Sequence, residues 1–307
     1  MTKEKSKSLR DMNIDEIFDI YLKIFNEIIC KNFIDQKFTE YKNKYNKFIE
    51  YKNLGYNSPT AMGRDKIAYG RTIIYGWLIE ELVAELFRSN LSVELVKNCG
   101  QDKEHDFVYC NISKNIKISG KKSSDPDLQV ILKNSAVFFL EIKTAVKNIF
   151  TFKMGGLKSL YKTSAEHEKP CIIFMLDLDK GLYNIVNLSY FENKSPFVNR
   201  NLEGQLCYNL PTPDKKLNEL LTDNLNSYFD ENFLNYSHIK KYRLLKIAKN
   251  SKNKKIIKII ENKMKIENLE LELKNFQDEI KVIEEIDKDV LKSWDEIEQI
   301  LKSILNS

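Results

Sequence analysis

Two carboxylates and a lysine near the middle of the chain have a spacing that suits metal chemistry. Asp127 precedes one apolar run, and Glu141 and Lys143 follow the next, with a polar turn signal around Asn134 between them. If a β-hairpin turns about Asn134, Asp127 lies directly opposite Glu141, and Lys143 emerges on the same face. Facing carboxylates repel unless a cation or a shared proton lies between them. The spacing therefore predicts a divalent-metal site beside an ammonium group.

The same register divides the hairpin into an apolar face and a partly polar face. A slip of one residue would push charges into the apolar face, so the pattern specifies the pairing. The face that carries the acids becomes polar only towards one end of the hairpin, where we expect an open cleft. Every residue on the opposite face is apolar: Leu128, Val130, Leu132, Ala136, Phe138, Leu140 and Ile142.

This arrangement resembles the PD-(D/E)xK nuclease superfamily, whose motif is a Pro-Asp at one strand and a Glu-x-Lys on its neighbour. The likeness covers Pro126, Asp127, Glu141 and Lys143, in the part of the chain able to form the family's α/β core. The resemblance implies that the acidic pair holds Mg²⁺, with help from the main-chain carbonyl of Ile142. It also implies that Lys143 orients or activates the attacking water.

The resemblance adds a helix acid to the candidate metal ligands, because these nucleases often carry a further Glu on the helix before the first core strand. Glu80 shares a helical face with Ile73 and Val83, whereas Glu81 lies on a competing stripe with Trp77. A carboxylate on an apolar stripe is costly unless it is paired or metal-bound. We favour Glu80 slightly over Glu81, and a solvated helix acid stays an open alternative.

Other titratable residues are weaker candidates. His105 and Asp106 open a predicted strand upstream, but no Glu-x-Lys partner lies at hairpin distance from them. The chain has three histidines, which are scattered and give no metal triad. Residues that follow the site closely, beside the glycine pair 155–156, are candidate phosphate contacts, although a solvated helix face is favoured for any single lysine. These residues are Lys147, Lys153, Lys158, Tyr161 and Lys162.

Glycine and proline divide the chain into three parts, because all 10 glycines and 6 prolines lie between Gly55 and Pro213. We expect a helical N-terminal region over 1–60, a nuclease core over 61–212 and a helical C-terminal region over 213–307. The predicted fold class is α/β. It comprises a restriction-endonuclease-like core, a mixed β-sheet flanked by helices, with helical N-terminal and long helical C-terminal extensions.

Hydrophobic periodicity predicts the elements that position the site. Asn13 and Glu16 form a capping-box-like start for the first helix. A fully apolar run over 171–178 predicts a central strand buried on both faces. Predicted helices cover 12–53, in two pieces of which the second spans 36–51, then 71–89 and 157–165; further strands cover 92–96, 105–112 and 182–188.

Two features of the C-terminal third suggest partners. The segment 240–265 holds eleven Lys or Arg against Glu261 alone, which favours phosphate binding. From Ile266 onward, apolar residues recur at alternating steps of three and four, interrupted only by Asp287. This seam predicts a coiled coil or a helix pair. A homodimer and helices that pack back on their own domain are equally favoured. The seam positions are 266, 269, 273, 276, 280, 283, 287, 290, 294, 297, 301 and 304.

Composition bounds the other expectations. The net charge of +5 permits polyanion binding without demonstrating it. Residues 1–10 are charged and lead into no apolar segment, and the longest apolar runs are too short for a membrane span. The five cysteines are odd in number and unclustered, as expected for reduced thiols of a cytoplasmic protein.

We therefore expect a Mg²⁺-dependent endodeoxyribonuclease that looks most like a type II restriction endonuclease. It would act on double-stranded DNA at a specific sequence, as a homodimer, without a nucleotide cofactor, since no P-loop string is present. One alternative is a structure-selective repair or recombination nuclease with the same site. The other is a non-catalytic DNA-binding coiled-coil scaffold. An RNA substrate lacks a recognisable RNA-binding module.

Overall fold

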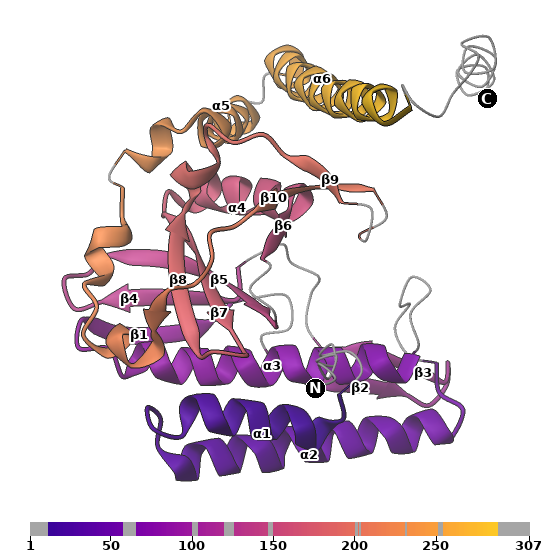
Figure 1. Ribbon diagram of the computed structural model, residues 1–307, viewed down its shortest axis with the longest axis vertical. Coiled ribbons are helices and arrows are strands. Elements are labelled where there is room, and N and C mark those ends of the chain that lie inside the picture. The colour runs from indigo at the N-terminus through magenta and orange to yellow at the C-terminus, as the bar shows by residue number, and fades with distance from the viewer. Residues whose placement is uncertain are drawn as a thin grey trace.

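A computed structural model shows how the chain folds. It describes residues 12–57, 66–99, 104–119, 126–146, 150–199, 202, 204–230, 232–250 and 254–287, without the side chains of 255, 256 and 275–287. The described part is a mixed α/β structure in which helices flank a mixed β-sheet (Figure 1). The coarse fold prediction is therefore confirmed.

Three helices build the N-terminal layer: α1 (Ile14–Phe25), α2 (Lys31–Asn53) and α3 (Lys66–Arg88). The predicted capping box starts α1, since the Asn13 side chain accepts from the Glu16 amide and the Glu16 carboxylate accepts from the Asn13 amide. Both α2 and α3 begin five residues before the predicted starts. Figure 1 shows α3 against the sheet, with α1 and α2 as an outer layer.

The central sheet has six strands in the order β1-β4-β5-β7-β8-β11. Only β5 and β7 run parallel; the other neighbours are antiparallel. The hairpin of β4 and β5 has the predicted register, because Leu128 pairs with Leu140 and Val130 pairs with Phe138. The strands are β1 (Val93–Asn98), β4 (Leu128–Leu132), β5 (Val137–Ala145), β7 (Cys171–Asp177), β8 (Leu182–Asn187) and β11 (Lys215–Lys216).

The two faces of the sheet bury separate cores. One core joins α1, α2 and α3 to the face that carries Leu128, Phe138 and Ile142, as the alternation predicted. The other core joins helix α4 (Met154–His167) to the face that carries Phe139 and Ile173. All residues of β7 are buried, in agreement with a central strand covered on both sides. The site face of the hairpin is therefore the α4 face.

Two small sheets lie beside the central one. The predicted strand over 105–112 is shorter, and it forms a separate hairpin of β2 (Phe107–Cys110) and β3 (Asn115–Ile118). A three-stranded sheet was not predicted; it consists of β6 (Thr151–Lys153), β9 (Phe197–Asn199) and β10 (Gln205–Asn209). Gly155 and Gly156 lie in the first turn of α4, so the glycine pair does not break the chain before the helix as expected.

The start of the C-terminal region is not the long helix that was predicted. After β11 the chain makes three short 3-10 turns, and the leucines of the first two complete the core beneath α3. Leu217, Leu220 and Leu225 are buried there, and this tertiary contact overrides local helix propensity. The turns are η3 (Leu217–Leu221), η4 (Leu225–Tyr228) and η5 (Phe233–Asn235); an earlier one, η1 (Leu188–Phe191), follows β8.

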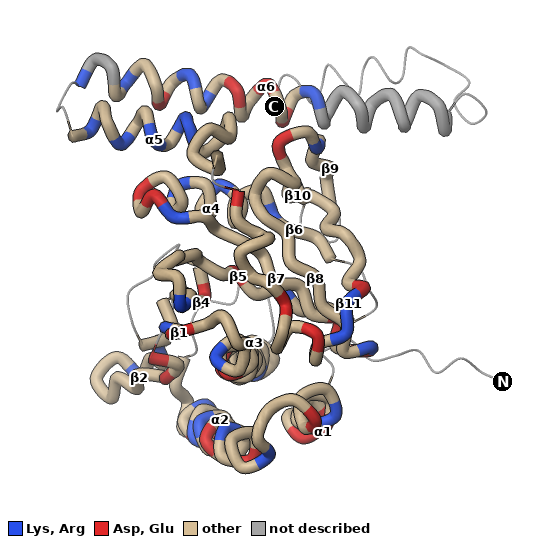
Figure 2. Tube along the Cα trace, turned by 90° about the vertical axis from the view of Figure 1, so that its left-hand side faces the viewer, with Lys and Arg blue, Asp and Glu red and all other residues tan. Residues whose placement is uncertain are grey.

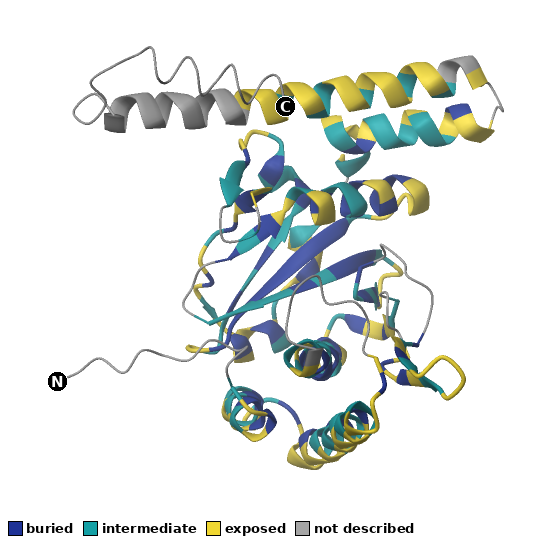
Figure 3. Cartoon of the chain, turned by 90° about the vertical axis from the view of Figure 1, so that its right-hand side faces the viewer, coloured by how far each residue is buried: buried dark blue, intermediate teal, exposed yellow. Residues whose placement is uncertain are grey.

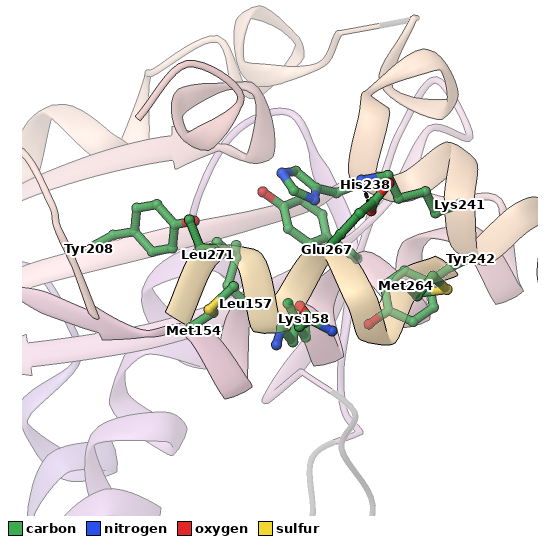
Figure 4. A pocket seen from close by; sticks show the side chains of 12 residues that line it. Met154, Leu157, Lys158, Tyr208, His238, Lys241, Tyr242, Met264, Glu267 and Leu271 are labelled. Carbon is green, nitrogen blue, oxygen red and sulfur yellow. Dashed lines mark hydrogen bonds and ion pairs between the residues drawn. The ribbon is translucent and has the colours of Figure 1, made fainter. Parts of the chain in front are cut away.

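The described chain ends with two helices, α5 (Ser237–Asn250) and α6 (Lys254–Asp287). They lie side by side and run in opposite directions (Figure 2). Met264, Glu267 and Leu271 of α6 face α4 and α5 around a small cavity of about 70 Å³ (Figure 4). The predicted seam lies elsewhere on the helix, since Leu269 and Leu273 are more than half exposed. Figure 3 shows this exposed surface along α6. Seam positions from 276 onward lie outside the described side chains.

No helix in the described ranges combines the length and the hydropathy that crossing a bilayer requires. Every described cysteine is a free thiol. Cys171 and Cys207 are buried, whereas Cys30 is exposed. The expectation of unpaired cysteines is therefore confirmed for these residues.

Candidate metal centre

The β4–β5 hairpin brings the predicted acidic pair together. Asp127 directly precedes β4, and continuing the observed pairing by one step places it opposite Glu141. The backbone amide of Ile142 donates to Asp127 Oδ2 at 2.7 Å, which fixes the carboxylate against β5. The Cys99 amide donates to the Asp127 carbonyl at 3.0 Å, so β1 holds the same residue from its other side.

Lys143 completes the predicted trio. Its Nζ lies 2.6 Å from Glu141 Oε1 and 5.3 Å from the centre of the Phe152 ring in β6. The Lys143 side chain is 36% exposed and the Glu141 side chain 17%, so the lysine is the more exposed of the two.

The electrostatics of the trio show uncompensated negative charge. Burial raises the pKa of Asp127, and the charges of Glu141 and Glu80 raise it further, well above its ordinary value. For Lys143, burial disfavours the ammonium, but the carboxylates of Glu141 and Asp127 outweigh it and raise the pKa of the lysine. Such a cluster favours a bound cation, because a cation removes the repulsion between the acids.

The two helix acids have different partners in the structure. Glu80 accepts from His105, and its charge contributes to the raised pKa values of Asp127 and Lys143. Glu81 accepts from the Asn98 side chain at 3.0 Å and pairs with Lys37 at 3.4 Å.

The sequence named His105 only as part of a weak rival site with Asp106, whereas the structure places its ring against the two helix acids. Its Nε2 lies 3.0 Å from Glu80 Oε2, and its Nδ1 lies 3.2 Å from Glu81 Oε1. Sequence spacing gives no signal for this contact, because the residues lie in different elements that only tertiary packing joins. Asp106, predicted beside it as a rival acidic site, accepts from the Phe107 amide at 2.8 Å.

The donor set fits a hard divalent cation. Carboxylate and carbonyl oxygens are the ligands that Mg²⁺ prefers, and Asp127, Glu141 and the Ile142 main chain supply them. A bound cation would relieve the repulsion between carboxylates that contributes to the raised pKa of Asp127. In the described residues, no three Asp, Glu, His or Cys side chains converge closely enough to hold a metal by themselves. Glu80 therefore forms no three-acid group with Asp127 and Glu141 in the part of the chain that the structure describes.

The residues expected to contact phosphate divide into two groups. Lys153 and Lys158 line a hollow of about 700 Å³ with Gly155 and Gly156 at the start of α4. The Phe152 ring joins the two places, since it lies beneath Lys143 Nζ and also beside Gly156 in the lining of the hollow. Tyr161 is not available for phosphate, because it is buried in the core beneath α4. Lys162 pairs with Glu166 on the helix surface, and Lys147 lies outside the described residues.

Part of the positive charge of the basic segment 240–265 is neutralised by ion pairs in the structure. Three of its lysines pair with acids, two of them outside the segment and the third Glu261 within it, so their charge is partly neutralised. Lys241 lies 2.6 Å from Glu267, and Lys246 lies 3.2 Å from Glu168. Figure 2 shows basic and acidic residues interleaved along α6. Phosphate binding by this segment stays a prediction, to which Lys241, Lys246 and Lys249 would contribute less than their sequence suggests.

No protein-family model matches the sequence, and no curated protein matches it either. The family resemblance consequently rests on Pro126, Asp127, Glu141 and Lys143 and on the hairpin that places three of their side chains together.

Proposed function

We propose that this protein is a Mg²⁺-dependent endodeoxyribonuclease of the PD-(D/E)xK type, most like a type II restriction endonuclease. The observation that carries the proposal is that the hairpin register places Asp127 opposite Glu141. Lys143, two residues further along the same strand, has its Nζ 2.6 Å from Glu141 Oε1. Double-stranded DNA is the proposed substrate, and hydrolysis of a phosphodiester bond is the proposed reaction. The restriction-endonuclease-like character of the core belongs to the same proposal.

Each residue of the trio has a distinct part in this chemistry. Asp127 and Glu141 would hold Mg²⁺ together with the Ile142 carbonyl, and the ion polarises phosphate and lowers the pKa of bound water. The Ile142 amide orients Asp127 by donating to Oδ2, which leaves Oδ1 for the ion. Lys143 keeps its proton beside the acids, so its ammonium can position the nucleophile and offset charge in the transition state.

The hollow beside the site supports a polyanionic substrate. Lys153 and Lys158 line it, and the first turn of α4 has no acidic residue and no side-chain cap at its N-terminus. Free amide groups at a helix start and nearby lysines both attract phosphate. A DNA backbone seated there would run next to Phe152 and bring its neighbouring phosphate towards Lys143.

The exposed seam of α6 supports a homodimer. Ile266, Leu269 and Leu273 are each more than half exposed, and the described chain packs against a different face of the helix. Of the two arrangements that the sequence left open, packing of the seam on its own domain does not occur over these residues. A second copy of α6 would cover the seam and supply the second site that cutting both strands of a duplex needs.

The test is plasmid cleavage by Lys143→Ala. We expect the variant to bind DNA as the unchanged protein does and to lose cleavage by at least a hundredfold in Mg²⁺, because the ammonium acts in the transition state. The matched control is Lys133→Ala, which removes an exposed lysine from the turn of the same hairpin and should leave cleavage unchanged. Cleavage retained by Lys143→Ala would refute the proposed site.

The same digest separates the alternatives. A sequence-specific endonuclease gives discrete fragments, and the mapped ends give its recognition site. A structure-selective nuclease cuts branched DNA in preference to plain duplex and gives no discrete pattern. A non-catalytic scaffold binds DNA equally in Mg²⁺ and in EDTA and never nicks the plasmid.

A further inference from the structure

The turn of the β2–β3 hairpin presents an aliphatic side chain to solvent. Ile112 is 99% exposed, more than any other large hydrophobic residue that the structure describes. Its neighbours Asn111 and Ser113 are exposed as well, and both are residues that turns favour, whereas isoleucine is not. A single exposed aliphatic residue is ordinary on a protein surface. This one lies at the end of a rigid and basic β-ribbon, formed by residues 107–118.

The end of α2 holds the turn of this ribbon in place. The Asn57 amide donates to the Lys114 carbonyl, and the Ile116 amide donates to the Asn57 carbonyl, both at 2.7 Å. The Tyr56 hydroxyl donates to Asn111 Oδ1 at 2.5 Å, and the Lys114 ammonium lies 4.6 Å from the centre of the Tyr56 ring. These contacts lie on both sides of the turn, so its position is set before any partner binds.

One face of the ribbon is packed against the protein and the other is basic. Ile116 is buried, and the Tyr109 ring stacks on the Tyr51 ring of α2 at a centroid distance of 3.9 Å. Lys117 is exposed on the outer face, and residues 107–118 contain two lysines and no acidic residue. Such a surface attracts phosphate groups. Because the inner face is packed, the turn is the part of the ribbon that projects towards a partner.

The base of the ribbon is connected to the proposed metal centre through a short series of contacts. Asn98 pairs in the sheet with Leu128, which directly follows Asp127. The Asn98 side chain donates to Glu81 Oε1 at 3.0 Å, and the same oxygen lies 3.2 Å from Nδ1 of His105, just before β2. Strands of four residues carry the turn about 13 Å beyond this base, a length of about four base pairs of duplex.

The ribbon and the acids also share one side of the molecule. In Figure 1, β2 and β3 lie at the right, whereas the turn of the β4–β5 hairpin lies at the left. The acids are at the opposite end of that hairpin from its turn. A duplex that reaches the acids would therefore pass the ribbon.

Building on the proposed function, we propose that the β2–β3 ribbon binds the substrate duplex by inserting Ile112 into its minor groove. That groove is about 6 Å wide and suits a single side chain, whereas a whole ribbon or helix needs the major groove of about 12 Å. An aliphatic side chain inserted between base pairs partly unstacks them and kinks the duplex by about 20–90°. Lys117 contacts a phosphate beside the groove, and the metal centre receives a bent duplex.

The test is bending of a DNA duplex that carries a fluorescence donor at one end and an acceptor at the other. A mixed sequence of about 30 base pairs with several TA steps is suitable, because these steps kink easily. EDTA prevents cutting during the measurement. We expect energy transfer to rise when the unchanged protein binds, since a kink brings the ends together. Ile112→Ser should lose this rise, because serine suits the turn but has no aliphatic group to insert. Ile112→Leu should keep it.

The control for the wedge is Leu91→Ser, at a leucine that is 70% exposed before β1, and this variant should bend DNA as the unchanged protein does. The phosphate contact is tested separately by the salt dependence of binding. Lys117→Ala should reduce the slope of the logarithm of affinity against the logarithm of salt concentration by about 1. Lys133→Ala, at an exposed lysine in the other hairpin, should leave that slope unchanged.

Two results overturn the wedge: DNA binding by the unchanged protein without a rise in energy transfer, or a full rise with Ile112→Ser. Cleavage of a plasmid in Mg²⁺ separates either result from failure of the proposed function. Cleavage without bending refutes the wedge alone, and bending in EDTA without cleavage in Mg²⁺ refutes the nuclease while the wedge stands. An unchanged protein that binds no DNA refutes both.

Discussion

The substitution Asp127→Asn tests whether the carboxylates of Asp127 and Glu141 repel each other in the absence of metal. In the absence of metal, Asp127 repels Glu141 across the hairpin and also feels the charge of Glu80. At a separation of about 5 Å and an effective dielectric constant of about 20, one such pair costs about 3 kcal/mol. Lys143 offsets part of this cost through its contact with Glu141. We therefore expect the variant to be more stable than the unchanged protein in EDTA, by about 1–2 kcal/mol.

The substitution keeps the local structure, which makes the comparison clean. An Asn side-chain oxygen can still accept from the Ile142 amide, so the contact at 2.7 Å survives. In a chain of this length the gain corresponds to a rise in melting temperature of about 2–4 °C. Asp35→Asn, the same change at an exposed position on α2, should leave the melting temperature unchanged.

Adding Mg²⁺ should reverse the order of the two proteins. At a concentration one hundred times its dissociation constant, an ion that binds only the folded state adds about 2.7 kcal/mol. The unchanged protein should gain this stability and Asp127→Asn should lose most of it. Differential scanning fluorimetry in EDTA and across a Mg²⁺ series measures both effects. A variant that melts lower in EDTA and gains as much from Mg²⁺ as the unchanged protein would refute the argument.

Three further predictions concern other parts of the molecule. Burial raises the pKa of Asp223, but hydrogen bonds from two tyrosine hydroxyls and a lysine outweigh it, so the pKa in the folded protein is lowered. The ionised Asp223 therefore stabilises the fold fully above its unfolded-state pKa of 3.8, and this stability is lost as the pH falls through the lower pKa of the folded protein. Asp223→Asn should therefore cost about 1–2 kcal/mol at pH 7, and chemical denaturation at a series of acidic pH values should show this cost shrinking. Phe174→Ala empties a fully buried position and should cost about 3–5 kcal/mol in urea unfolding, whereas Val108→Ala at a half-exposed position should cost less than about 0.5 kcal/mol. Leu269→Lys should convert a dimer to a monomer in light scattering, while the same change at Leu91, a more exposed leucine before β1, should not. A monomer in both the unchanged protein and Leu269→Lys would refute the homodimer.

Local alternation determined the site hairpin, because a strand has a period of two and its apolar residues must share one face. That constraint placed Asp127 opposite Glu141 without knowledge of any distant contact, and the observed pairing of Leu128 with Leu140 agrees with it. The capping box at Asn13 was equally predictable, since its partners lie three residues apart. In both cases the interacting groups are close in sequence, so the pattern of residue types carries the information.

Contacts between distant segments were not predictable in the same way. The segment that forms β11 and the turns after it was predicted to be helical. In the structure, β11 pairs with the edge strand β8, and the leucines of the next two turns are buried beneath α3. The sequence of the α6 seam did not indicate whether the seam faces the protein or the solvent. In the structure, α6 packs on its neighbours with a different face, which carries Met264 and Leu271. Salt bridges from remote acids likewise neutralise part of a segment that is strongly basic in sequence.

For this protein, the sequence by itself determined the acidic pair, its lysine and the strands that present them, because each depends on neighbours along one hairpin. Only the tertiary structure decided the partners of the two helix acids, because Glu80 contacts His105 whereas Glu81 also contacts Asn98 and Lys37. Glu80 and Glu81 are adjacent on one helix and differ by a rotation of 100° about its axis. What separates them is the position of these partners, which packing alone sets.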